Sequence, residues 1–193
     1  LAGRSTVNTG GVVTVASGEG TATSSGAITI RSSNGGGSGV SGKLVFSSGT
    51  SSGGNSGALY LGSGKATGGR GGLVMITVGE GDSAVGGAAQ IESGGSFGGA
   101  GGDFRIVTGR NFDNGASSSG SLYMRTSNSG SDSGVSGSIT IASGTSRSGS
   151  TGALMLSTGI ATGGAGGAVT MSVGEGDTGS GGDLNLAAGK SAV

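Results

Sequence analysis

The chain has 193 residues, 51 of them glycine, and its ten basic and ten acidic side chains give a formal net charge of zero. Neither nucleic acid nor an anionic membrane is therefore an expected partner. The chain contains no cysteine, histidine or proline and no G-X-Y period, which excludes disulfides, the usual zinc sites and collagen. No apolar run approaches the ~20 residues that a membrane helix needs.

A short repeat runs through the whole chain. Each of twelve units begins at a repeat glycine, which we count as position zero, and most units are 15 residues long. Apolar residues stand at positions two and four, usually a small residue at position six, and usually a closing glycine at position seven. The repeat glycines are Gly11, Gly26, Gly42, Gly57, Gly72, Gly87, Gly102, Gly120, Gly137, Gly152, Gly167 and Gly182.

The spacing of two between aliphatic residues predicts a short β-strand in every unit. We call these residues the apolar pairs: Val13/Val15, Ile28/Ile30, Leu44/Phe46, Leu59/Leu61, Val74/Ile76, Ala89/Ile91, Phe104/Ile106, Leu122/Met124, Ile139/Ile141, Leu154/Leu156, Val169/Met171 and Leu184/Leu186. The pattern predicts an all-β fold, a single-stranded parallel β-solenoid of about 12 coils with the apolar pairs stacked inside. The alternative is about 6 coils of about 30 residues. The sequence does not choose the hand.

The remaining positions of each unit are rich in glycine, serine, alanine and threonine. We call positions eight to fourteen the connector. A closing glycine is expected to turn a corner with φ > 0. The residue two positions after it is almost always tiny, as in Gly20, Ser51 and Ser96, which predicts a thin back wall packed against the aliphatic strand.

A longer repeat lies on top of the short one. Residues 38–91 match residues 133–186 at an offset of 95, with 29 of 54 positions identical. The sequence therefore predicts one continuous solenoid over residues 1–193 built from two six-unit modules, about 11–101 and 102–193. Because no capping sequence is recognisable, we expect the chain to be an excerpt of a longer array.

Candidate chemistry is sparse. Two Gly-Glu-Gly-Asp segments place carboxylates close together, and Glu80, Asp82, Glu175 and Asp177 are weak Ca²⁺ candidates. A polar outer corner is the simpler interpretation, because Ca²⁺ takes six to eight oxygen ligands. A serine nucleophile would lack a histidine base. We expect no enzyme, no catalytic residue and no cofactor.

The outward positions of three consecutive units contain apolar residues. Val45, Tyr60 and Met75 share one outward position and Leu73 flanks them; in stacked coils they would form one contiguous patch. Such patches favour lateral contacts. We therefore predict an assembly surface of Val45, Tyr60, Leu73 and Met75, and self-association both laterally and end to end. Other filament proteins or glycans are further candidate partners.

The unit pattern G-x-φ-x-φ-x-S-G-x-S-x-x-G-x-(S/G)-G resembles the long Gly/Ser-rich β-solenoid repeats of secreted fibres, adhesin stalks and mastigoneme-like filaments. The resemblance implies an extracellular or cell- or virion-surface location and a structural role in a filament, fibre or stalk. One alternative is an ice-binding β-solenoid, although Lys43, Tyr60, Met75 and Arg105 interrupt a flat threonine array. A further alternative is a carbohydrate-binding or carbohydrate-cleaving β-helix.

Overall fold

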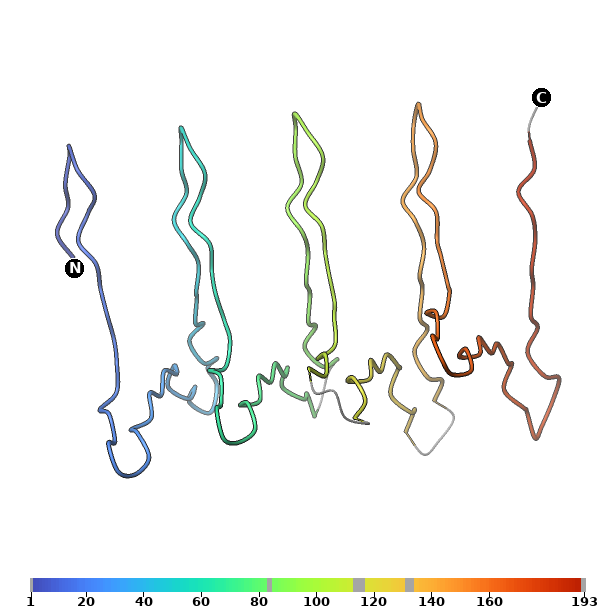
Figure 1. The fold of residues 1–193 in the computed structure, drawn as a ribbon, viewed down its shortest axis with the longest axis horizontal. Helices are drawn as coiled ribbons and strands as arrows, with labels where there is room; N and C mark the ends of the chain where they lie inside the picture. Colours follow the sequence, from blue (N-terminus) through green and yellow to red (C-terminus); the bar gives the residue numbers. More distant parts are fainter. Residues whose placement is uncertain (1, 83–84, 113–116, 131–133, 192–193) are drawn as a thin grey trace. The chain divides into compact units, whose positions relative to one another are not determined.

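The computed structural model describes residues 2–82, 85–112, 117–130 and 134–191. These residues contain no helix and no β-strand, and thus no helix that could cross a membrane. The chain runs in extended segments joined by bends and narrow loops (Figure 1). It divides into two parts, the N-terminal part (Leu1–Glu92) and the C-terminal part (Ser93–Val193), which we describe separately. The two six-unit modules stay a prediction.

The predicted β-solenoid is wrong, in both its 15-residue and its 30-residue form. A solenoid needs continuous strand pairing between coils and a buried apolar ladder. The described residues have no strands, and no hydrophobic side chain among them is buried. Leu59 and Val74, expected inside, are 54% and 55% exposed, and Leu61 and Ile76 are 75% and 79% exposed.

The physical reason lies in what one unit can bury. Each unit supplies two bulky apolar side chains, whereas all of its roughly fifteen residues, many of them glycine, must lose conformational freedom to form a coil. The accessible surface of the chain is 19218 Å². A compact folded monomer of this mass would expose ~7,900 Å² and an unfolded chain ~25,500 Å². The apolar pairs are therefore not buried by intrachain packing.

Hydrogen bonds between glycine backbones close several connectors into loops. In the N-terminal part, Gly11 N donates to the Gly3 carbonyl at 2.9 Å and Gly26 N to the Gly18 carbonyl at 3.0 Å. In the C-terminal part, Gly102 N donates to Gly94 O and Gly120 N to Gly109 O, both at 2.9 Å. We call each such bond a clasp. A clasp joins a repeat glycine to the preceding closing glycine, or to Gly3, so the chain reverses direction between them (Figure 1).

A recurrent contact lies between a repeat glycine and position six of the unit before it. A methyl group on the repeat glycine would stand within 4 Å of that side chain in eleven successive cases. The pairs are Ser17–Gly26, Ser32–Gly42, Ser48–Gly57, Ser63–Gly72, Val78–Gly87, Ser93–Gly102, Thr108–Gly120, Thr126–Gly137, Ser143–Gly152, Thr158–Gly167 and Val173–Gly182. Val78 and Val173, 43% and 44% exposed, are the least exposed of the large apolar side chains. This glycine contact is the local centre of each unit.

The expectation for the closing glycines is also wrong. Positive φ occurs at Gly163 (96°) and Gly179 (97°), which lie inside connectors. None of the closing glycines in the described residues has a positive φ. In four of the loops, Gly3 or a closing glycine instead supplies the carbonyl that accepts the clasp.

The small residue two positions after the closing glycine has a local role. At three of these positions a serine hydroxyl accepts the backbone N–H three residues later: Ser51 from Gly54 at 3.1 Å, Ser96 from Gly99 at 3.0 Å and Ser146 from Gly149 at 3.0 Å. At Gly20, a side chain would collide with the carbonyl of Ser24. The connector therefore needs small residues for its own bend, and not for the predicted back wall.

Candidate functional site

The four residues of the predicted assembly surface are all exposed. Tyr60 is 90% exposed and Met75 71% exposed, and Val45 and Leu73 are exposed as well. Their predicted contiguity depended on stacked coils, which the described residues do not form. The assembly role of these four side chains stays a prediction.

The structure also exposes the side chains that the sequence assigned to a core. The bulky members of all twelve apolar pairs are exposed, from Val13 near one end to Leu186 near the other. The period-two spacing predicted that each apolar pair lies on one face of a strand, and the described residues contain no strand.

In a clasped loop, the apolar pair lies outside the closed connector. Gly102 N bonds to Gly94 O, so the connector between them is folded back on itself. Ser93 stands against Gly102. Each apolar pair lies in the extended segment that begins at the repeat glycine, such as Phe104 and Ile106 after Gly102. The backbones of Gly94 and Gly102 are held close together where the connector begins and ends. The side chains of Phe104 and Ile106 lie outside this connector.

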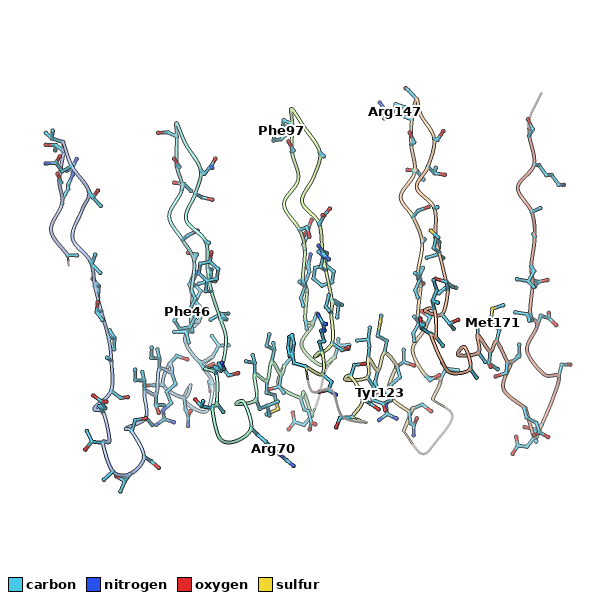
Figure 2. All side chains as sticks on the ribbon, in the orientation of Figure 1. Phe46, Arg70, Phe97, Tyr123, Arg147 and Met171 are labelled. Atoms are coloured by element: carbon cyan, nitrogen blue, oxygen red, sulfur yellow. The ribbon has the colours of Figure 1, made fainter. Side chains whose placement is uncertain are left out.

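The loop ends carry side chains that the sequence pattern did not single out. Figure 2 shows Phe97 and Arg147 where two narrow loops turn. Phe97 is 115% exposed, more than any other large apolar residue. Both residues stand at position ten of their units, which varies in charge and size along the chain. A variable position within an otherwise regular repeat was the sequence signal that could have identified these side chains.

The lengthened loop between Gly109 and Gly120 has contacts of its own. The Arg110 guanidinium lies over the Phe112 ring, 5.2 Å from its centroid. The Asn111 side-chain amide donates to the Ser117 carbonyl at 2.8 Å. The hydrogen bond between Asn111 and Ser117 joins the two sides of the described part of the loop.

The calcium candidates are not assembled into a metal site in the described residues. Glu80, Asp82, Glu175 and Asp177 are exposed, and no group of three or more acidic, histidine or cysteine residues lies close enough to hold an ion. Asp177 accepts a hydrogen bond from the neighbouring Thr178 hydroxyl at 3.4 Å. A polar corner remains the simpler interpretation of these carboxylates.

The part of the chain that the structure describes has no pocket. The candidate site in each of its two parts is therefore the set of exposed apolar pairs. Comparison with protein-family models, curated proteins and solved structures finds no match to this chain.

Proposed function

We propose that this chain is a structural repeat protein that associates with copies of itself to form part of a filament, fibre or stalk outside the cell or on a cell or virion surface. The observation that carries the proposal is the exposure of the apolar pairs in every unit. Because the units repeat, any surface that fits one unit fits the others. The Gly/Ser-rich repeat and its resemblance to secreted fibres support the location.

The repeat number explains why association would be cooperative. Full burial of one aliphatic side chain contributes about 1.5–3 kcal/mol. Association itself costs about 4–15 kcal/mol in lost translational and rotational freedom. One unit with two aliphatic side chains does not reliably offset that cost. Several consecutive units do, because later contacts form within an already joined complex.

Net charge favours the same outcome. The chain has a formal net charge of zero, so copies do not repel one another as a whole.

The ice-binding and carbohydrate alternatives both relied on the regular face of a β-solenoid or β-helix. The described residues do not form that face, and no observation favours either alternative.

The test is sedimentation velocity combined with electron microscopy over a micromolar-to-millimolar concentration series. The wild-type chain should form elongated particles whose size grows with concentration. A variant with Leu59, Leu61, Val74 and Ile76 all changed to serine should assemble only at clearly higher concentration. A matched control changes four exposed residues outside the apolar pairs, Thr50, Thr67, Thr77 and Thr162, to serine. A wild-type chain that stays monomeric throughout the series would overturn the proposal.

A further inference from the structure

The charged side chains fall into a pattern when they are counted from the repeat glycine. Position eight, the first residue of the connector, carries seven of the twenty charges. In chain order their signs alternate without exception. They are Arg4, Glu19, Lys65, Glu80, Arg110, Glu175 and Lys190, where Arg4 follows Gly3 as the others follow a closing glycine.

Three of the opposite-sign neighbours stand in adjacent units. Arg4 and Glu19, Lys65 and Glu80, and Glu175 and Lys190 are each 15 residues apart. At Arg4, Glu19 and Arg110, position eight directly follows the residue whose carbonyl accepts a clasp, which is Gly3, Gly18 or Gly109. All seven charges therefore stand at equivalent positions of the repeat, and three of them also stand beside a clasp.

These seven charges are available to a partner. All seven are exposed, and none forms an ion pair with another residue that the structure describes. Arg110 lies over the Phe112 ring. In a single chain the alternation has no pairing that would explain it.

We infer that copies of this chain associate side by side and parallel with a stagger of one repeat unit, set by the position-eight charges. In an unstaggered parallel pair, each of the seven charges would lie opposite the same charge of the second copy. A one-unit stagger places Arg4 opposite Glu19, Lys65 opposite Glu80 and Glu175 opposite Lys190 of the second copy. The remaining charges at position eight then meet no like charge.

The apolar pairs and the charges contribute differently to this arrangement. Any whole-unit stagger brings apolar pairs opposite apolar pairs, so burial favours long overlap without selecting a register. The surface needed is available, since a stable interface buries roughly 1,600 Å² and this chain exposes 19218 Å². The charges disfavour the fully overlapped register and favour the next one, because like-charge contacts penalise wrong partners. A repeated one-unit stagger does not close, so it extends into a filament.

The inference rests on the proposed function, and mixing of two charge variants tests it separately. K65E and E80K chains each place like charges opposite each other in the staggered pair. Each variant alone should assemble at about two- to fivefold higher concentration than wild type at low salt. An equimolar mixture should return to the wild-type value, because positions 65 and 80 of neighbouring copies then carry opposite charges wherever a K65E chain lies beside an E80K chain. The differences should shrink in 1 M salt.

Matched controls separate register from net charge. R31E and E92K change the net charge of the chain by the same amounts, and both residues are exposed. In the staggered pair these residues face Ser47 and Val107, so neither variant should be impaired alone. If wild type assembles but K65E and E80K assemble equally well, or their mixture is no better than either alone, the stagger is overturned while self-association stands. If wild type does not assemble, the proposed function itself fails.

Discussion

Gly87 packs directly against Val78: a methyl group on Gly87 would stand 2.5 Å from Val78 Cγ1. Real carbon atoms do not approach so closely, so only glycine fits without a shift of its neighbour. Val78 is also among the least exposed large apolar side chains. The same contact recurs at Val173 and Gly182, at 3.0 Å.

Gly87→Ala should therefore weaken the local packing of its unit. Overpacking costs about 1–3 kcal/mol in closed cores, and the value here should lie at the low end because Val78 can turn toward solvent. Nuclear Overhauser effects between residues 78 and 87 should weaken or disappear. Gly86→Ala is the matched control, because a methyl group there would meet nothing within 4 Å. Equal behaviour of the two variants would show that the contact is not tight in solution.

The clasp between Gly26 and Gly18 should depend on Gly20. A side chain at residue 20 would collide with the carbonyls of Thr23 and Ser24 inside the connector. Gly20→Ala should therefore open the loop and speed hydrogen exchange of the Gly26 amide, which donates to Gly18 O at 3.0 Å. Gly18→Ala is the control, since nothing lies within 4 Å of its added methyl group. Unchanged exchange in Gly20→Ala would contradict the described loop.

The bend at residues 97–99 should depend on the Ser96 hydroxyl. It accepts the Gly99 N–H at 3.0 Å, and a typical intramolecular hydrogen bond contributes about 0.5–1.5 kcal/mol. Ser96→Ala should open the bend more often and raise the rate of chymotrypsin cleavage after Phe97, since cleavage follows the open population. Ser96→Thr keeps the acceptor and should be cut at the wild-type rate. Equal cleavage of all three chains would remove this role of the hydroxyl.

The predicted assembly surface makes a separate claim about Tyr60. If Val45, Tyr60, Leu73 and Met75 contact a neighbouring copy, Tyr60→Ser should raise the concentration needed for assembly. Tyr123→Ser is the matched control, because Tyr123 is 87% exposed compared with 90% for Tyr60 and has no apolar neighbours at the same outward position in the adjacent units. Light scattering against concentration gives the comparison. Identical curves would assign lateral contact to other residues.

The repeat unit could be predicted from the sequence, but the way in which units pack against one another could not. The repeat glycine was identified by spacing alone, and in the structure that glycine contacts position six, as Gly72 does Ser63. Burial of Leu59 and Ile76 was inferred from the same spacing, but it requires neighbouring coils to stack. Stacking is a long-range arrangement that a local period does not encode. The sequence of an apolar pair is the same whether its side chains are buried by the same chain or by another copy.

For the candidate surface the same distinction holds. The exposed outward residues could be listed from their positions, whereas the arrangement of Val45 and Tyr60 relative to each other depended on the solenoid. The roles of the connector residues were predicted incorrectly for a different reason. Ser96 and Gly20 are small because of hydrogen bonds and carbonyl contacts within a few residues. Composition alone does not distinguish those contacts from packing against a second wall.

The clasps also give the chain a reserve of length under tension. Gly94 O and Gly102 N are 2.9 Å apart, yet eight fully extended residues span ~26–29 Å. Pulling the chain would open each clasp by breaking one backbone hydrogen bond, without unfolding a buried core. Opening an eight-residue clasp would lengthen the chain by roughly 25 Å, and opening the eleven-residue clasp between Gly109 and Gly120 would lengthen it more. A fibre built from such chains would stretch in many small, reversible steps and would absorb mechanical work before its contacts between copies were strained.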